Sequence, residues 1–255
     1  MILPPQLQTL FLGKSRVHID SLGSTNDYLK EMLLENGQLP DGFAVSADYQ
    51  RSGRGQVGSQ WQSEAQKNLL VSVLLRPKNL SADHYFLLNM SVCLAINDTL
   101  NFFHDGFLVK WPNDILFDQK KVAGILIENS IAKNRLRQSI VGIGINVNQH
   151  QFRGQFGEKI SSLARINGQA VDRAYLLAQL FQNLESRYLQ LQRLGSSIKD
   201  EFLEKLYGYH RQVPVKIEGR LHQAEIQEVG LDGTLYSLIN GHIQKFQFKE
   251  IEFVL

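Results

Sequence analysis

The last 45 residues carry the pattern that most restricts the fold, which is a set of short apolar segments at nearly even spacing. These segments occupy residues 213–217, 224–229, 234–239 and 243–248. The dipeptides between them are typical of tight turns: Glu218-Gly219, Asp232-Gly233 and Asn240-Gly241. Short strands joined by such turns are typical of a small β-barrel. We therefore predict a β-barrel unit over residues 211–255, with a domain boundary near residue 210.

The preceding 210 residues mix strand and helix patterns. Apolar runs bounded by Pro, Gly and Asn predict strands at 43–49, 69–75, 107–110, 115–118, 122–128 and 139–147. A hairpin turn is expected at residues 118–121. Apolar residues at helical spacing predict four helices, which run from Ser24 or Thr25 to Gly37, from Ser81 to about Phe103, from Asp172 to Gly195 and from about Lys199 to Tyr207.

Composition and charge argue against several classes of protein. The chain has 27 Lys+Arg and 25 Asp+Glu, and these are interspersed, so no basic stripe indicates nucleic-acid binding. No apolar run approaches the roughly 18 residues of a membrane span. The prolines Pro4 and Pro5 argue against a signal peptide. Cys93, the single cysteine, lies in an apolar run, where a buried, inert thiol is expected. A cytoplasmic protein is the simplest interpretation.

Residues 50–61 form a polar, glycine-rich loop between two predicted strands. Gly53, Gly55 and Gly58 match the dinucleotide-binding pattern G-x-G-x-x-G, but a strand follows where that motif requires a helix, which argues against a Rossmann site. Glycines let the backbone approach an anion, Arg54 suits a carboxylate or phosphate, and Trp61 offers an apolar face. A flexible surface loop is the alternative.

A second segment places a lysine near a rigid polar turn. Pro112 fixes a turn that carries Asn113 and Asp114, and Lys121 begins the apolar strand that follows. On these residues alone, an ammonium that extends into solvent is favoured over one that meets a negative ligand.

In a third segment, residues 141–148, glycine and isoleucine alternate. This leaves one strand face bare, for a flat ligand or for another backbone.

Taken in order, these segments resemble the biotin protein ligase family. The resemblance rests on Ser24-Thr25-Asn26, the loop Gly53-Arg54-Gly55-x-x-Gly58 with Trp61, Lys110-Trp111-Pro112-Asn113-Asp114, Lys121 with Gly124-Ile125-Leu126, Gly142-Ile143-Gly144-Ile145-Asn146, and Ser161-Ser162-Leu163. It implies an α+β fold with a mixed or antiparallel sheet and flanking helices, like a class II aminoacyl-tRNA synthetase core, followed by a small SH3-like β-barrel. Only about 20 residues precede Ser24, too few for the helix-turn-helix domain of some relatives, so a catalytic-core-only member is expected.

The resemblance also implies an activity. Biotin reacts with ATP and Mg²⁺ to give biotinyl-5'-AMP, and biotin then passes to a lysine of the biotin carboxyl carrier protein of acetyl-CoA carboxylase. Catalytic roles fall on Lys121, Arg54 and Asp114. The residues implied for biotin binding are Ser24, Thr25, Asn26, Gln50, Gly53, Arg54, Gly55, Gln56, Trp61, Lys121 and Gly124. Those implied for ATP or the adenylate are Arg54, Gly58, Trp61, Asn113, Lys121, Gly142, Gly144 and Asn146.

The same resemblance places Mg²⁺ with ATP near Asn146, predicts no metal held by protein side chains, and suggests a homodimer formed through a sheet edge. The chain departs from the commoner family loop at Gln56 and Ser59, where arginine is usual, so we expect the adenylate to be held less tightly. Lys249 replaces the glycine of a Gly-Glu pair. The competing interpretations are a lipoate-type ligase of related fold and a non-catalytic biotin-binding protein.

Overall fold

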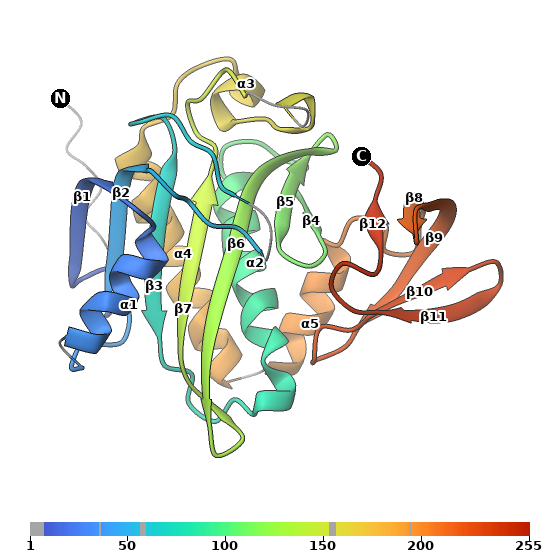
Figure 1. Ribbon diagram of the computed structural model, residues 1–255, viewed down its shortest axis with the longest axis horizontal. Coiled ribbons are helices and arrows are strands. Elements are labelled where there is room, and N and C mark those ends of the chain that lie inside the picture. The colour runs from blue at the N-terminus through green and yellow to red at the C-terminus, as the bar shows by residue number, and fades with distance from the viewer. Residues whose placement is uncertain (1–7, 36, 57–59, 153–156, 194) are drawn as a thin grey trace.

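The computed structural model describes residues 8–35, 37–56, 60–152, 157–193 and 195–255. Its main feature is a seven-stranded mixed sheet with the order β1-β2-β3-β7-β6-β5-β4 (Figure 1). The strands are β1 (Arg16–Leu22), β2 (Ala44–Gln50), β3 (Leu69–Leu75), β4 (Leu108–Lys110), β5 (Asp114–Phe117), β6 (Lys120–Ala132) and β7 (Arg135–Ile145). β1 and β2 are parallel, and the other neighbours are antiparallel. The expected α+β class is confirmed.

Helices cover both faces of this sheet. α1 (Thr25–Glu35) packs against β2, β3 and β7, while α2 (Phe86–Asn101) and α4 (Arg173–Arg193) pack together on the opposite face (Figure 1). β3 is buried along its whole length, with Val71 and Val73 in the larger hydrophobic cluster and Leu74 in the smaller one below α1. Its continuous apolar sequence therefore reflects a strand that is covered on both sides.

The sequence predicted six of the seven strands and missed β1. β1 lies at the sheet edge and is largely exposed, so it lacks the apolar run that marks a buried strand. The turn at Asp118 and Gln119 has positive φ at both residues, which confirms the predicted hairpin.

The helix predictions were correct in position but not at every end. Asp172 caps α4 as predicted, because its Oδ1 accepts hydrogen bonds from the N–H groups of Ala174 and Tyr175. Ser81 caps only a 3-10 turn (Ala82–His84) and makes no side-chain capping bond, so α2 begins later than predicted. Gly195 does not close α4: it begins α5 (Gly195–Glu204), which the sequence placed at 199–207.

The C-terminal part forms a five-stranded sheet with the order β11-β10-β9-β8-β12. Its strands are β8 (Gln212–Ile217), β9 (Arg220–Val229), β10 (Leu235–Ile239), β11 (His242–Phe246) and β12 (Glu252–Phe253). Positive φ at both residues of Glu218-Gly219 and Asn240-Gly241 confirms two predicted turns. Within residues 211–255, all of which are described, β11 and β12 do not pair, so the sheet is open and the expected closed barrel is not observed.

The two sheets share one hydrophobic core. The larger cluster runs without a break from β3 and α2 into β8 to β12. Trp111, which precedes β5, donates from Nε1 to the carbonyl oxygen of Gly233 at 3.0 Å. Phe86 of α2 packs against Phe248 in a tilted arrangement, with ring centroids 6.0 Å apart.

Cys93 is fully buried in α2, and burial raises the pKa of its thiol, so the prediction of a buried thiol is confirmed. Among the described helices, none combines the length and the apolar character needed to cross a membrane.

Candidate functional site

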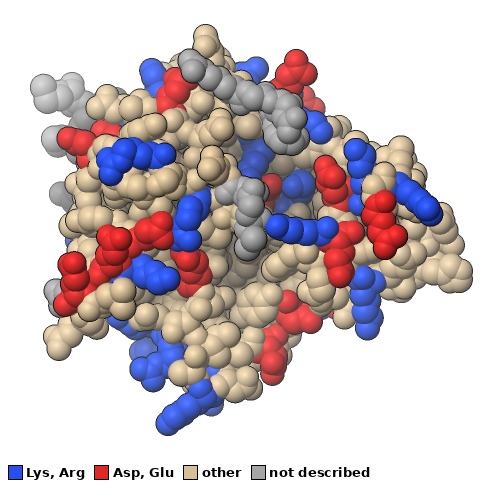
Figure 2. All heavy atoms as spheres, viewed as in Figure 1, with Lys and Arg blue, Asp and Glu red and all other residues tan. Residues whose placement is uncertain are grey.

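A cavity of about 190 Å³ opens where β6 and β7 run beside the start of α1 and the glycine-rich loop. Figure 2 shows Lys and Arg side chains on both sides of a hollow in the middle of this face. The lining draws on segments far apart in the sequence: Ser24–Asn26, Gln50, Arg54–Gln56, Gln60, Trp61, Lys110, Pro112–Asp114, Lys121, Gly124–Leu126 and Gly142–Gly144.

One end of the cavity is polar but uncharged. Ser24, Thr25 and Asn26 are buried at the start of α1. The N–H and Oγ1 of Thr25 donate to Oε1 of Gln50 at 2.7 and 3.0 Å. Ser72 Oγ of β3 lies 2.7 Å from Thr25 Oγ1 and 2.6 Å from Asn26 Oδ1. This network fixes the rotamer of Gln50, so the cavity presents preorganised neutral donors and acceptors that suit an uncharged polar ligand.

The indole of Trp61 forms one wall. It packs so closely on two strand glycines that a Cβ at Gly144 would lie 2.6 Å from Trp61 Cε2, and a Cβ at Gly124 would lie 3.1 Å from Cζ3. Glycine is therefore required here for close approach. The bare face of residues 141–148 was expected to receive a flat ligand or another backbone. The structure shows instead that the indole of Trp61 covers Gly144 and that the Asn26 side chain covers Gly142.

Arg54 lines the cavity while bound to two carboxylates. Its Nη2 lies 2.6 Å from Asp27 Oδ1 and 2.8 Å from Glu128 Oε2. The same oxygen of Glu128 accepts from Asn26 Nδ2 at 2.8 Å. An incoming anion must therefore compete with two carboxylates for the guanidinium of Arg54.

Asp114 and two lysines form the charged end. Lys121 Nζ lies 2.5 Å from Asp114 Oδ1, and Lys110 Nζ lies 3.1 Å from Oδ2, so each lysine binds a different oxygen. Only 14% of the Asp114 side chain is exposed. Burial alone would raise the pKa of Asp114, but the two ammonium groups outweigh this and hold its pKa below the usual value. Lys121 is thus held at the cavity, and the solvent-directed alternative is not supported.

The turn that carries Asp114 is anchored on both sides. Asn113 Nδ2 donates to the carbonyl oxygen of Ile125 at 2.5 Å. The N–H of Ile125 in turn donates to the backbone carbonyl oxygen of Asn113 at 3.1 Å. Trp111 is 2% exposed and is bound to the C-terminal sheet. These contacts explain why the chain has Trp and Asn on either side of Pro112, because they fix the backbone from which Asp114 projects.

The structure brings most of the predicted site residues to this cavity, with three exceptions. Gly53 does not line the cavity but packs against the backbone of Trp61, where a Cβ would lie 2.5 Å from the Trp61 carbonyl oxygen. Asn146 is 3% exposed and is not among the described residues that line the cavity, while its backbone is bonded to Val122 and Leu163. Gly58, like Ser59, lies outside the described residues.

The sequence motifs assign no role to three charged residues that belong to the site or bind to it. Asp27 directly follows Ser24-Thr25-Asn26, and Glu128 lies four residues after Gly124 on β6. Their closeness to these motifs in the sequence is a feature that could identify them as site residues. Lys110 begins the Trp-Pro-Asn-Asp segment, and its pairing with Asp114 across β4 and β5 follows from that hairpin. No sequence pattern pairs Arg54 with Glu128, because their contact depends on how the loop lies over β6.

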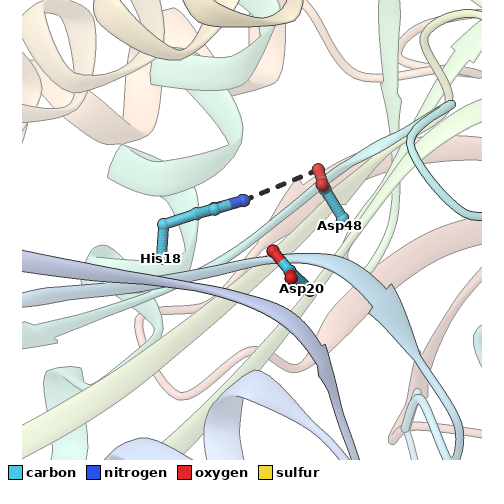
Figure 3. A group of neighbouring side chains, drawn as sticks. All are labelled: His18, Asp20 and Asp48. Atoms are coloured by element: carbon cyan, nitrogen blue, oxygen red, sulfur yellow. Dashed lines mark ion pairs between the residues drawn. The ribbon is translucent and has the colours of Figure 1, made fainter.

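The described lining does not fit a Mg²⁺ ion held by protein side chains. Its one carboxylate, Asp114, is occupied by two lysines. The candidate metal group found in the described part of the chain, His18, Asp20 and Asp48, lies on β1 and β2 and does not line the cavity (Figure 3). There Asp48 is paired with Arg173 at 2.9 Å and with His18 at 3.6 Å.

Comparisons of the sequence with known proteins find relatives in one protein ligase family. Residues 19–146 match the model of the biotin/lipoate A/B protein ligase family. The chain is 34% identical over 187 residues to the bifunctional ligase/repressor BirA of Bacillus subtilis, covering 71% of this chain and 56% of that protein. It is 26% identical over 203 residues to the biotin–[acetyl-CoA-carboxylase] ligase of Mycobacterium tuberculosis, covering 77% and 73%. It therefore spans just over half the length of the first of these curated relatives.

Solved structures agree with these sequence matches. The biotin protein ligase of Aquifex aeolicus in complex with biotin and ATP superposes with a TM-score of 0.77 at 26% identity, covering 94% of this chain and 99% of that one. The biotin protein ligase of Leishmania major in complex with biotinyl-5-AMP gives a TM-score of 0.63 at 20% identity, which supports the shared fold.

Proposed function

The chain belongs to the biotin/lipoate A/B protein ligase family, and on that premise we propose that it forms biotinyl-5'-AMP from biotin and ATP and then transfers biotin to a lysine of a biotin carboxyl carrier protein, that of acetyl-CoA carboxylase. One observation carries the proposal. A single cavity joins a neutral polar end, an indole wall and the two cations Arg54 and Lys121. A ureido ring, an apolar chain and a carboxylate, which are the parts of biotin, match these three regions in turn.

The first step brings one anion to another. A carboxylate oxygen of biotin bonds to the α-phosphorus of ATP, the bond from that phosphorus to the bridging oxygen breaks, and pyrophosphate leaves with the electron pair. Negative charge gathers on the non-bridging oxygens. Lys121 and Arg54 stabilise that charge in a partly enclosed cavity, where electrostatic contacts are stronger than in water. Mg²⁺ that accompanies ATP would be coordinated by the phosphates and water.

The second step releases AMP. The neutral amine of the acceptor lysine attacks the acyl carbon, the bond from that carbon to the phosphate oxygen breaks so that AMP leaves with the electron pair, and the nitrogen passes its proton to the Asp114 carboxylate. Asp114 faces the cavity as a carboxylate, because its two lysines favour the ionised form. We assign it a double role, in which it holds Lys121 in place and orients the incoming amine.

Biotin-dependent exchange of labelled pyrophosphate into ATP tests the proposal. Exchange that requires biotin is the expected result, followed by transfer of biotin to a purified carrier domain. Exchange supported only by lipoate would favour the lipoate-type ligase. An absence of exchange with either acid, in protein that still binds biotin, would identify a non-catalytic binding protein.

Replacing Asp114 with alanine (D114A) is expected to slow transfer to the carrier domain at least about ten-fold more than it slows adenylate formation. Both steps lose rate because Lys121 loses its partner, but only transfer also loses the group that orients the amine. Single-turnover measurements with purified biotinyl-AMP separate the two steps. Equal losses would show that Asp114 acts only through Lys121.

Replacing Gln56 with arginine (Q56R) is expected to slow the escape of free biotinyl-AMP roughly ten-fold, because a charge-assisted hydrogen bond to the adenylate phosphate is added. Gln56 lines the cavity beside Arg54. Dissociation of labelled adenylate, chased with unlabelled biotin and ATP, gives the rate directly. The same escape rate in both proteins would contradict the idea that this position controls retention.

Three features of the architecture are also proposed. The boundary between a catalytic unit and a C-terminal unit lies near residue 210, and the open sheet of residues 211–255 belongs to the SH3-like class, which its short strands and tight turns support. The protein forms a homodimer through a sheet edge, for which β1 is available because, among the described strands, β2 alone pairs with it. Its proposed substrates place it in the cytoplasm.

A further inference from the structure

Glu128 of β6 does not line the cavity, but it binds two residues that do. Its Oε2 accepts a hydrogen bond from Asn26 Nδ2 at 2.8 Å and lies 2.8 Å from Arg54 Nη2. Asn26 is buried at the neutral end of the cavity, and Arg54 belongs to the glycine-rich loop. A single carboxylate oxygen therefore joins the loop to the neutral end of the cavity.

The contact with Asn26 is the first of a series that crosses four elements. Asn26 Oδ1 lies 2.6 Å from Ser72 Oγ, which lies 2.7 Å from Thr25 Oγ1. Thr25 Oγ1 in turn donates to Gln50 Oε1 at 3.0 Å. This side-chain network, which consists of Glu128, Asn26, Ser72, Thr25 and Gln50, joins β6, α1, β3 and β2. The direction of its hydrogen bonds decides what the cavity offers to a ligand.

Glu128 determines the direction of hydrogen bonding in this network. A carboxylate that pairs with a guanidinium accepts hydrogen bonds and donates none, so the Asn26 amide turns its NH2 group toward Glu128 and its oxygen toward Ser72. The Ser72 hydroxyl has one proton for its two contacts, and Asn26 Oδ1, which can only accept, takes it. Thr25 Oγ1 consequently shares its own proton between Ser72 and Gln50, and its lone pairs remain for an N–H group in the cavity.

Arg54 holds Glu128 in the same orientation from the side of the loop. Its guanidinium has only donors, and Nη2 also lies 2.6 Å from Asp27 Oδ1. The two carboxylates differ in their surroundings, because 46% of the Asp27 side chain is exposed and 30% of the Glu128 side chain. An exposed ion pair contributes little, whereas Glu128 is bound at the same time to a buried amide. Glu128 is therefore the carboxylate through which the loop and the side-chain network affect each other.

We propose that Glu128 is a positioning residue for biotin, which sets the Thr25 hydroxyl to accept a hydrogen bond from the ureido ring. This inference rests on the proposed function and adds a residue to it. A ureido ring carries N–H donors, so it binds best where acceptors are already directed into the cavity. Glu128 supplies this order from outside the cavity. It acts through Asn26 and Ser72 and makes no contact with biotin.

The test replaces Glu128 with alanine (E128A), which leaves the Asn26 amide free to turn over. The KM for biotin is expected to rise about ten-fold, the size of one charge-assisted contact. The rate of adenylate formation at saturating biotin is expected to fall less than about three-fold, because Lys121 and its partner Asp114 are unchanged. The KM for ATP is expected to change less than about two-fold.

Two single variants serve as controls. Glu128→Gln is expected to recover most of the biotin affinity, because Arg54 has only donors and so turns the new amide oxygen toward itself and Asn26. Glu31→Gln removes an exposed carboxylate one helical turn after Asp27 on α1, outside the cavity, and is expected to have no effect. A Glu128→Gln protein as weak as E128A would show that the charge alone matters and would contradict the positioning role.

A double-mutant cycle with Ser72 tests whether the effect passes through the side-chain network. Ser72→Ala removes the hydroxyl between Asn26 and Thr25, so Glu128 no longer sets the direction of hydrogen bonding at the cavity. In that background E128A is expected to raise the KM for biotin less than about two-fold. A rise of about ten-fold there as well would mean that the two residues act independently, and it would overturn the inference.

Trypsin tests the contact with the loop without any ligand. The peptide bond after Arg54 is expected to be cleaved at least about three-fold faster in E128A than in the native protein, because the guanidinium has lost one of its two carboxylates. Cleavage after Arg51, which donates to Ser21 Oγ at 3.0 Å, is the internal reference and should not change. An unchanged ratio of the two cleavage rates would count against the inference, because Glu128 would then not hold the loop.

A native KM for biotin in E128A would overturn the inference, as would equal rises for biotin and ATP. If the native protein shows no biotin-dependent exchange, the proposed function fails instead. Calorimetric titration of native and E128A protein with biotin alone still decides the inference in that case, because weaker binding by E128A supports it and equal binding or none overturns it.

Discussion

Replacing Lys121 with alanine (K121A) is expected to reduce the rate of biotinyl-AMP formation roughly 10²- to 10³-fold, the usual effect of removing one preorganised group that stabilises a transition-state charge. Lys121 is held in position at the cavity, since its ammonium lies 2.5 Å from Asp114 Oδ1. The loss should therefore fall on the chemical step. Single-turnover formation of biotinyl-AMP at saturating biotin and ATP measures it.

The adjacent Lys120 offers a matched control. It pairs with Phe117 at the end of the β5–β6 hairpin and does not line the cavity, so Lys120→Ala should retain native activity. Because K121A also leaves Asp114 with Lys110 as its one cationic partner among the described residues, the thermal midpoint must be measured as well. The double variant R54A/K121A removes both cations. If it still formed biotinyl-AMP at the native rate, the proposed mechanism would be wrong.

Replacing Gly144 with alanine (G144A) is expected to raise the dissociation constant for biotin about 10- to 100-fold, or about 1.4–2.8 kcal/mol. The new Cβ would lie within 3 Å of three atoms of the Trp61 indole, which must move toward the cavity it now borders. Calorimetric titration with biotin measures the loss. Alanine is compatible with a β-strand, so the fold should persist, which circular dichroism can verify.

Two further variants identify the cause of that loss. Gly37→Ala is the control, because no atom of the described residues, the chain neighbours of Gly37 apart, lies within 4 Å of a Cβ at that position. Trp61→Phe in the G144A background should recover part of the affinity, because the smaller ring leaves space for the added methyl group. Native biotin affinity in G144A would contradict the role of Trp61 as a cavity wall.

The sequence predicted those parts of the fold that depend on local chemistry. β3 is recognisable because every residue of Leu69–Leu75 is buried, and α4 because Asp172 caps it. β1 could not be found in the same way, since an exposed edge strand carries no apolar signature. Gly195 was assigned as a helix end because glycine usually ends helices, but here a second helix begins at that residue.

The sequence motifs identify most of the residues that line the candidate site, but they do not show which side chains pair with one another. Trp61, Lys121 and Gly144 were identified from their motifs, and they do share a cavity. The ion pair between Arg54 and Glu128 joins residues 74 positions apart, so it depends on how the loop folds over β6. Asn146 shows the opposite error, since it belongs to the glycine-rich strand motif but is buried beside Val122 and Leu163 instead of lining the cavity.

The indole of Trp111 is a physical link between distant ends of the chain. Its hydrogen bond to Gly233 reaches 122 residues along the sequence, and the same tryptophan begins the turn from which Asp114 projects. Truncation after residue 210 would therefore remove none of the described residues that line the cavity around Trp61, yet it would remove one of the two anchors of that turn and leave only the bonds between Asn113 and Ile125. The turn that places Asp114 at the cavity is therefore held in part by a contact that residues 211–255 supply.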